Sequence, residues 1–274
     1  MYRIFAKEVL APTISKFVID APFIARKRQP GNFVMVRMVE TGERIPLTLV
    51  DSDAAAGSIT LIVQGVGKTT KALLSKNVGD SLVDVVGPLG NPTPIAYHGN
   101  VVCVGGGVGA AELWPIARAM KAIGNSLRTI IGARSKELVI LESEMSAISE
   151  RCYITTDDGS SGRKGLVTDQ LHELLETIGG VEAVYAIGPL RMMKAVSALT
   201  KKYTLKTYVS LNAIMVDGTG MCGGCRVSIG GEMKFACVDG PEFDGHLVDF
   251  DELIMRNRTY RDQERIAEHY PLPV

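Results

Sequence analysis

The stretch VVCVGGGVGAAE, Val101 to Glu112, decides the fold of the central part of the chain. An apolar run comes first, a glycine-rich turn follows, and helix-forming residues complete the stretch. Glycines between a buried strand and a helix let the backbone approach a phosphate group, and the helix start adds unpaired N–H groups. Ala110 stands where the G-x-G-x-x-G pattern has its last glycine. The stretch therefore predicts a nucleotide-binding turn, with a plain tight turn as the alternative.

Strands and helices alternate downstream of this turn. The apolar patterns predict strands at 100–104, 127–132, 152–156, 183–187 and 205–209. Between them we expect helices at 110–122, 139–149, 168–178 and 190–202. Such alternation is typical of a doubly wound parallel sheet, which we assign to residues 96–210. Sheets of this kind bind ligands at the carboxyl ends of their strands.

The part of the chain before the turn has a different rhythm. Short alternating runs at 2–10, 13–20, 32–38, 45–51, 58–64 and 81–86 predict strands, with one helix at 69–76. Six short strands separated by turn residues favour a closed antiparallel β-barrel, assigned to residues 1–95. The Gly/Pro-rich segment GPLGNPTP, residues 87–94, separates the two domains.

The composition restricts the possible functions. A chain of 274 residues suggests two domains and a small appendage. The formal net charge is zero, which argues against nucleic acid and anionic membranes as partners. The start of the chain lacks a signal-peptide pattern, and there is no apolar run of transmembrane length. Five cysteines without an export signal favour free or metal-bound thiols, so we expect a cytoplasmic protein.

The remaining segment, 211–274, contains a cysteine pattern. Cys222, Cys225 and Cys237 have the spacing C-x2-C-x11-C. Plant-type 2Fe–2S proteins use C-x4-C-x2-C…C, and counting back from Cys222 by that spacing gives Asp217. A carboxylate is a competent iron ligand. The pattern predicts a 2Fe–2S cluster on these four residues, with a structural zinc site on the same residues as the alternative. The polar tail, 249–270, favours a surface or partner-facing helix.

A second phosphate site is predicted in the barrel. The sequence VQGVGKTTKALL runs from a strand through a glycine turn into a helix. Gly67, Lys68, Thr69 and Thr70 would place N–H groups and hydroxyls at that helix start, which suits a second pyrophosphate.

With both glycine turns in this order, the chain resembles the ferredoxin–NADP reductase superfamily. The Arg-x-Pro-Leu-Thr motif in GERIPLTLVD is similar to the Arg-x-Tyr-Ser-type flavin motif of that superfamily. Proline at the aromatic position is typical of its branch of dihydroorotate dehydrogenase electron-transfer subunits. The resemblance implies bound FAD. Its contacts would be Arg44, Pro46, Leu47, Thr48, Ile62, Val63 and Gln64, with the phosphates at Gly67, Lys68, Thr69 and Thr70.

The same resemblance implies NAD(H) in the second domain. The nucleotide contacts carried over are Gly106, Gly107, Val108, Gly109, Ala110, Asp157, Asp158, Gly188, Pro189 and Met192. Met192 and Met193 are equally compatible with a helix core. Arg134 suits either a surface salt bridge or a nucleotide phosphate. No acidic residue follows the second strand, so the choice between NADH and NADPH stays open.

The C-terminal motif is also similar to the small subunits of NADH-dependent reduced ferredoxin:NADP oxidoreductases, a family in which aspartate ligation is a feature. The dihydroorotate dehydrogenase branch generally has cysteine there. This resemblance implies hydride transfer between nicotinamide C4 and flavin N5. Single electrons would then pass through the 2Fe–2S cluster to a larger partner subunit, which carries a second FAD and two 4Fe–4S clusters. The partner would bind NADP(H) and ferredoxin, and the pair would carry out electron bifurcation.

Hydride transfer needs no side-chain acid or base, so we predict no catalytic residue. Two alternatives stay open. One is the electron-transfer subunit of dihydroorotate dehydrogenase, with the same cofactors and a pyrimidine-synthesis partner. The other, of a different class, is a zinc-stabilised binding module without catalysis.

Overall fold

The N-terminal part of the computed structural model is built from two antiparallel sheets. The structure describes residues 1–267, 269 and 270. One sheet has the order β5-β6-β2-β1-β7 and the other β4-β3-β8, so the predicted antiparallel barrel is confirmed. Its elements are β1 (Tyr2–Ala11), β2 (Ile14–Asp20), α1 (Pro22–Lys27), β3 (Phe33–Arg37), β4 (Arg44–Thr48), β5 (Asp51–Asp53), β6 (Ser58–Gln64), α2 (Lys68–Ser75), β7 (Ser81–Leu82) and β8 (Asp84–Leu89).

The barrel differs from the sequence prediction in three details. The expected strand 45–51 is two strands, β4 and β5, which belong to different sheets. The expected strand 81–86 likewise divides into β7 and β8. Helix α1 was not predicted, because its six residues are too short to show a helical period. Side chains of both sheets, among them Phe17, Val34 and Leu61, fill the space between them.

The middle of the chain forms the predicted parallel sheet, with order β12-β11-β10-β9-β13-β14-β17. All pairs are parallel except β14–β17. Its elements are β9 (Asn100–Gly106), α3 (Gly109–Ala122), β10 (Ser126–Ala133), η1 (Lys136–Leu138), α4 (Glu142–Ile148), β11 (Arg151–Thr156), β12 (Arg163–Lys164), α5 (Val167–Thr177), β13 (Val181–Ile187), α6 (Leu190–Lys202) and β14 (Lys206–Ser210).

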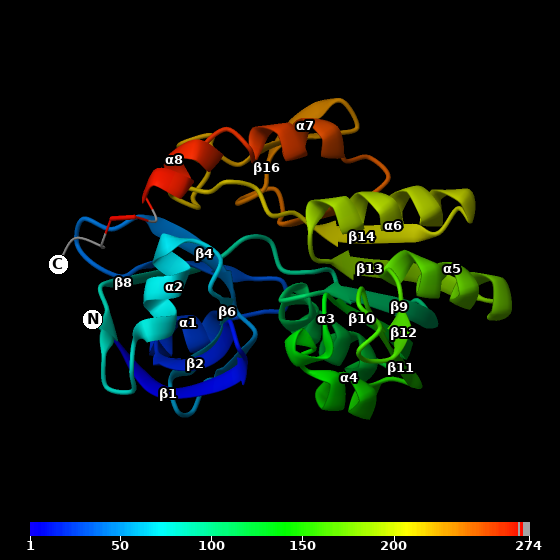
Figure 1. Ribbon diagram of the computed structural model, residues 1–274, viewed down its shortest axis with the longest axis horizontal. Coiled ribbons are helices and arrows are strands. Elements are labelled where there is room, and N and C mark those ends of the chain that lie inside the picture. Colours follow the sequence, from blue (N-terminus) through cyan, green and yellow to red (C-terminus); the bar gives the residue numbers. More distant parts are fainter. Residues whose placement is uncertain (268, 271–274) are drawn as a thin grey trace.

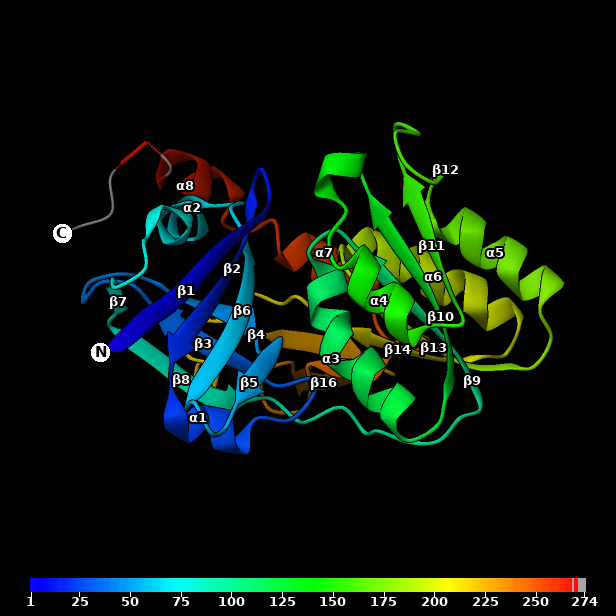
Figure 2. The ribbon, with the colours of Figure 1, turned by 90° about the horizontal axis from the view of Figure 1, so that it is seen from below.

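Helices cover both faces of this sheet, as Figures 1 and 2 show. Val101 and Cys103 of β9 pack in one cluster with α3 and α4. Val102 and Val104, which point the other way, pack in a second cluster with α5 and α6. Period-two alternation of a strand buried on both faces explains this division. The expected helix 139–149 is wrong at its start, because the left-handed backbone of Leu141, with φ 58°, separates η1 from α4.

The C-terminal segment packs onto the parallel sheet. It contains β15 (Arg226–Ile229), β16 (Glu232–Phe235), β17 (Glu242–Asp244), α7 (Phe250–Arg256) and α8 (Arg261–Ala267). Strand β17 pairs antiparallel with β14, and Val227 and Phe250 join the cluster formed by α5 and α6. Figure 1 shows α7 and α8 lying over the sheet and the barrel.

The predicted tail helix is interrupted. Residues 257–260 separate α7 from α8, and residue 268 of the prediction lies outside the described residues. The domain boundaries at 95/96 and 210/211 stay a prediction. No helix in the described part of the chain is long and apolar enough to cross a membrane.

Candidate functional site

Two cavities lie side by side where the barrel meets the parallel sheet. Cavity 1, of about 630 Å³, lies at the carboxyl ends of the sheet strands. Cavity 2, of about 410 Å³, lies between the barrel and the start of the C-terminal segment. Five residues line both cavities, and we call this shared wall the seam: Gln64, Val66, Val108, Glu112 and Asn212. A ring bound in one cavity would therefore lie next to a ring bound in the other.

The glycine turn of the opening stretch forms the floor of cavity 1. Gly107 has φ 56°, a left-handed conformation that favours glycine, and no atom lies within 4 Å of the place that a Cβ would take. Its N–H donates to the Gly132 carbonyl at 2.8 Å. Gly109, in contrast, lies directly against the Ile187 carbonyl and Gly188, so a side chain there would collide with the backbone. Gly107 is therefore needed for the backbone conformation of the turn, whereas Gly109 is needed for close packing of α3 against β13.

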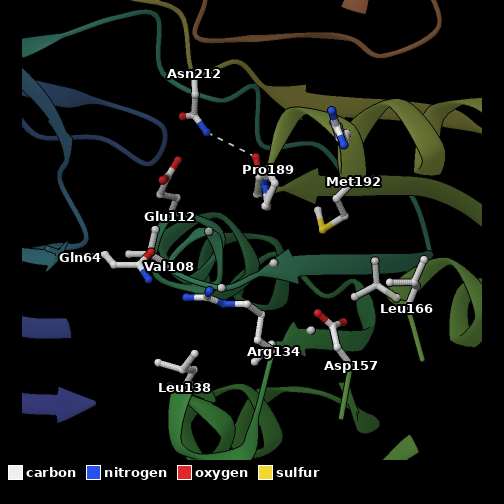
Figure 3. A pocket seen from close by; sticks show the side chains of 18 of the residues that line it. Gln64, Val108, Glu112, Arg134, Leu138, Asp157, Leu166, Pro189, Met192 and Asn212 are labelled. Atoms are coloured by element: carbon white, nitrogen blue, oxygen red, sulfur yellow. Dashed lines mark hydrogen bonds between the residues drawn. The ribbon is translucent and has the colours of Figure 1, made fainter. Parts of the chain in front are cut away.

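Most of the predicted nucleotide contacts line cavity 1. Gly106, Gly107, Val108, Gly109, Arg134, Asp157, Gly188, Pro189 and Met192 all do so. Figure 3 shows Arg134, Asp157 and Met192 around the cavity. Arg134 makes no ion pair within the described residues, so its guanidinium remains available to a nucleotide phosphate.

Two predicted contacts lie elsewhere. Ala110 is fully buried in the core beneath the turn, and Asp158 does not line the cavity. The exposed Asp158 carboxylate accepts hydrogen bonds from Ser160 N at 2.9 Å and Ser160 Oγ at 2.6 Å. Met193, the other half of the methionine pair, is fully buried, so Met192 is the one that faces the cavity.

Six of the seven predicted flavin-ring contacts line cavity 2: Pro46, Leu47, Thr48, Ile62, Val63 and Gln64. Arg44 does not line it, and its guanidinium lies 3.6 Å from the Asp84 carboxylate on the barrel. Ala213, Ile214 and Met215, which lead into the cysteine loop, form another wall. Cavity 2 is therefore in contact with the barrel, the sheet and the cysteine segment.

The start of α2 does not line either cavity. The Thr70 hydroxyl accepts hydrogen bonds from the N–H groups of Val66 and Gly67, both at 3.0 Å. The Thr69 hydroxyl donates to the Glu43 carboxylate. Both hydroxyls thus hold the turn in shape. The groups that remain for a phosphate are the N–H groups of the first helical turn, beginning at Lys68.

Sequence reasoning missed three residues of the seam, Val66, Glu112 and Asn212. Glu112 lies in the first turn of α3. The Asn212 side chain donates to the Gly188 carbonyl at 3.3 Å, and the Asn212 backbone carbonyl accepts from the Asn257 side chain at 2.6 Å. An acidic residue just after a phosphate-type turn is an available sequence signal, because an anion there would oppose phosphate binding. Asn212 carries no comparable signal.

The cysteine loop brings its predicted ligands together in two pairs. The sulfurs of Cys225 and Cys237 lie 3.2 Å apart, and both residues are buried. Asp217 and exposed Cys222 form the other pair, because the Asp217 carboxylate accepts the Cys222 N–H at 2.8 Å. It also accepts the Thr219 N–H at 2.6 Å. These backbone N–H groups hold the pKa of Asp217 below its usual value, Thr219 foremost.

This donor set fits a 2Fe–2S cluster. Each of the two irons binds two of the four protein ligands, so the ligands need to lie close together in pairs rather than as one group of four. Within the described residues, no three His, Cys, Asp or Glu side chains gather as a mononuclear site would require. Burial, with the hydrogen bond to Cys225, raises the pKa of Cys237 to about 12, so a bound metal must displace its proton. The Cys222 sulfur accepts the Gly224 N–H at 3.4 Å, as thiolate ligands do.

An antiparallel barrel, a doubly wound nucleotide-type sheet and a cysteine loop beside their junction define a reductase of the ferredoxin–NADP reductase type. Residues 212–249 match the family model of the iron–sulfur cluster binding domain of dihydroorotate dehydrogenase B. A Thermotoga maritima protein named dihydroorotate dehydrogenase B (NAD(+)), electron transfer subunit homolog is 48% identical over 265 residues. This match covers 97% of this chain and 93% of that protein.

A dihydroorotate dehydrogenase B electron transfer subunit of Geobacillus thermodenitrificans is 32% identical, with 88% of this chain and 94% of that protein covered. The chain therefore belongs to the family of dihydroorotate dehydrogenase B electron transfer subunits and their homologues. A solved chain of the NADH-dependent reduced ferredoxin-NADP oxidoreductase is 46% identical with a TM-score of 0.93. It covers 98% of this chain and 97% of that one.

Proposed function

We propose that this chain is the electron-transfer subunit of an NADH-dependent reduced ferredoxin:NADP oxidoreductase. The observation that carries the proposal is the continuity of the site. Cavity 1 shares the seam with cavity 2, and cavity 2 contacts the segment that leads to Asp217 and the cysteines. A nicotinamide, a flavin and an iron–sulfur cluster could thus occupy consecutive positions. The likeness to the solved oxidoreductase supports the same assignment.

The chain's own residues would bind and shield the cofactors. Thr48 and Gln64 offer polar groups to FAD in cavity 2, while Pro46, Leu47 and Ile62 exclude water from its ring. Gly106, Gly107 and Gly109 admit the NADH pyrophosphate, and Arg134 offers it a positive charge. Asp217, Cys222, Cys225 and Cys237 would hold the 2Fe–2S cluster. FAD supplies the conversion between two-electron and one-electron chemistry.

The larger subunit belongs to the proposal as well. By the family resemblance it would carry a second FAD and two 4Fe–4S clusters and would bind NADP(H) and ferredoxin. The homologue names support an electron-transfer subunit that works with a partner. A cytoplasmic location remains part of the prediction.

The second candidate is the electron-transfer subunit of dihydroorotate dehydrogenase, which the family model and homologue names favour. Asp217 distinguishes the two, since by the sequence resemblance that branch generally has cysteine at this position. The partner of the native protein decides between them. A partner with NADP(H)- and ferredoxin-dependent activity is expected, whereas a dihydroorotate-oxidising partner would assign the second function.

The experiment is anaerobic purification from the native host. We expect a coloured protein whose small chain contains FAD, two irons and two acid-labile sulfides, together with a larger chain. NADH should bleach the flavin absorbance. Colourless protein with one zinc per chain and no flavin would instead support the zinc-stabilised binding module.

A further inference from the structure

Glu112 is the one seam residue with an ionisable side chain. It begins on the first turn of α3 and lines both cavities. Figure 3 shows its carboxyl between the side chains of Gln64 and Asn212. The surface that Glu112 still exposes therefore faces the two cavities. A carboxyl group would thus be in contact with the rings that we place there.

The environment of Glu112 favours the neutral acid. Burial raises its pKa to about 7, and a hydrogen bond from the Thr48 hydroxyl lowers it only in part. No cation contributes to the shift. Near neutral pH the group is therefore divided between acid and carboxylate, which suits a residue that both accepts and releases a proton. Thr48 itself lines cavity 2 and ties Glu112 to the barrel.

A second buried carboxyl lies close to the first. Glu242 of β17 has both oxygens buried, and neither they nor the hydroxyl of nearby Thr93 make a hydrogen bond within the described residues. Burial raises the pKa of Glu242 to about 7, and the charge of Glu112 contributes to the rise. Two carboxylates in such a place repel each other, so one of the pair tends to keep its proton.

Other titratable groups complete the surroundings. Tyr185 of β13 packs in one cluster with α3, and burial raises its pKa, with the charge of Glu242 as a smaller cause. Cys103 of β9 packs in the same cluster, and burial raises its thiol pKa to about 12. Both stay protonated at neutral pH. Besides Glu112, the residues with charged side chains that line the cavities are Arg134, Asp157, Arg191 and Glu264.

We propose that Glu112 takes up the proton that the flavin loses once both electrons have left it. This inference rests on the proposed function, because it requires FAD in cavity 2. It assigns a catalytic residue to a step other than hydride transfer.

The proposed step balances. Hydride transfer breaks the nicotinamide C4–H bond and forms an N–H bond on the flavin, so NADH is oxidised and the flavin gains two electrons. These electrons leave singly to the 2Fe–2S cluster. The Glu112 carboxylate then forms an O–H bond as that N–H bond breaks, and it later releases the proton to water in the cavities. One hydride thus becomes two electrons for the partner subunit and one proton for solvent.

The first test needs no cofactor. Infrared spectra of the full chain, titrated from pH 5 to 9, should show a protonated-carboxyl C=O band that disappears near pH 7. Glu112→Gln should remove the part of this band that belongs to Glu112 and leave the part that belongs to Glu242, whereas Glu144→Gln on the exposed surface of α4 should retain both parts. A band with unchanged amplitude and midpoint in Glu112→Gln would show that Glu112 does not exchange a proton in this pH range and would overturn the proposal.

The second test uses the FAD-loaded complex. An indicator dye in weak buffer records proton release while the electrons leave for an acceptor. Glu112→Gln should slow this release by roughly tenfold or more, with hydride transfer from NADH less affected. Glu112→Asp should restore part of the rate with a shifted pH profile. Glutamine has nearly the shape of glutamate, so the variant should fold, which its melting curve will verify.

The outcomes separate the two proposals. A chain that binds no FAD contradicts the proposed function, while the infrared titration still reports on Glu112. A variant Glu112→Gln that binds FAD and releases protons at the wild-type rate, with an unchanged pH profile, contradicts the role of Glu112 alone.

Discussion

Asp217 has two possible tasks in the cysteine loop. Its carboxylate accepts two backbone N–H groups, and the spacing also predicts it to be the first cluster ligand. Asp217 is partly exposed, and both hydrogen bonds lie within its own loop, so they shape the loop rather than stabilise the whole chain. Mutation can separate the two roles. A cysteine at position 217 can still bind iron, but it cannot accept both backbone hydrogen bonds.

We expect Asp217→Cys to retain a 2Fe–2S cluster with an altered visible spectrum and redox potential, because thiolate is softer than carboxylate. Asp217→Ala should lose cluster during purification or take water as a ligand. Visible and electron paramagnetic resonance spectra, with iron and sulfide analysis, measure both effects. Asp217→Asn is the control, since its amide oxygen can still accept a hydrogen bond. An unchanged spectrum and potential in Asp217→Ala would remove Asp217 from the ligand set.

Glu112 and Glu242 should make the stability of the chain depend on pH. Burial raises both pKa values from 4.5 to about 7, so the folded state binds protons that the unfolded state has released. The stabilising protonated form is fully present below about pH 4.5 and is lost as pH rises through about 7. Each carboxyl accounts for roughly 3 kcal/mol at most.

Thermal unfolding of the cofactor-free chain, measured between pH 5 and 8, tests this linkage. The melting temperature should fall as the pH rises from 5 to about 7 and level off above that, apart from the contributions of other groups. Glu112→Gln or Glu242→Gln should flatten the fall, while the exposed Glu144→Gln should leave it unchanged. If the slope were the same in all four proteins, the raised pKa values would be refuted.

At the scale of elements, two glycines in the turn between β9 and α3 should affect different properties, one the stability of the chain and the other the binding of NADH. Gly109→Ala places a methyl group against the Ile187 carbonyl, so β13 or α3 must shift. Gly107→Ala meets no neighbour but must adopt φ 56°, which costs about 1 kcal/mol. We therefore expect Gly109→Ala to lower the free energy of unfolding by more than Gly107→Ala.

The pair of glycine variants also differs in ligand binding. The added methyl group at position 107 would point into open space beside cavity 1, where the pyrophosphate is proposed to lie. Urea unfolding and NADH titration, done on both variants, give the comparison. Gly107→Ala should weaken NADH binding while leaving the chain nearly as stable. Wild-type NADH affinity in Gly107→Ala would argue against a pyrophosphate at this turn.

At the scale of the whole molecule, an ion pair joins the barrel to the parallel sheet. The Arg118 guanidinium on α3 donates two hydrogen bonds to Asp51 on β5, at 2.9 and 2.6 Å. Burial acts to raise the Asp51 pKa, but the bonds from Arg118 and Ser52 outweigh it, and the pKa is lowered. The side chains are 42% and 39% exposed, so solvent screens their attraction.

A double-mutant cycle on Asp51→Ala and Arg118→Ala should give a coupling energy of about 1 kcal/mol in urea unfolding. The bidentate geometry places the value at the upper end for partly exposed pairs. The pair Lys194–Asp251, between α6 and α7, is the comparison, and its greater exposure predicts a smaller coupling. Equal couplings of zero would mean that apolar packing alone holds the barrel to the sheet.

The sequence by itself determined the elements and the motifs that work locally. The turn at Gly105–Gly109 could be predicted because the backbone there needs residues without a side chain. Asp217 could be predicted as a ligand because cluster ligands on one loop keep a fixed spacing. The alternation of strands and helices predicted the parallel sheet, since burial on both faces leaves a clear apolar pattern.

Only the tertiary structure decided how the parts meet. Thr48, Glu112 and Glu242 are far apart in the chain, and they gather because the barrel, α3 and β17 close around one junction. Likewise, β17 follows the cysteines in sequence yet completes the edge of the nucleotide sheet. No local pattern records such contacts, because each residue's role depends on burial and charge contributed by the other segments. The physical reason is that burial raises the pKa of Glu112 and Glu242, and this burial exists only once the barrel, the sheet and the C-terminal segment have packed together.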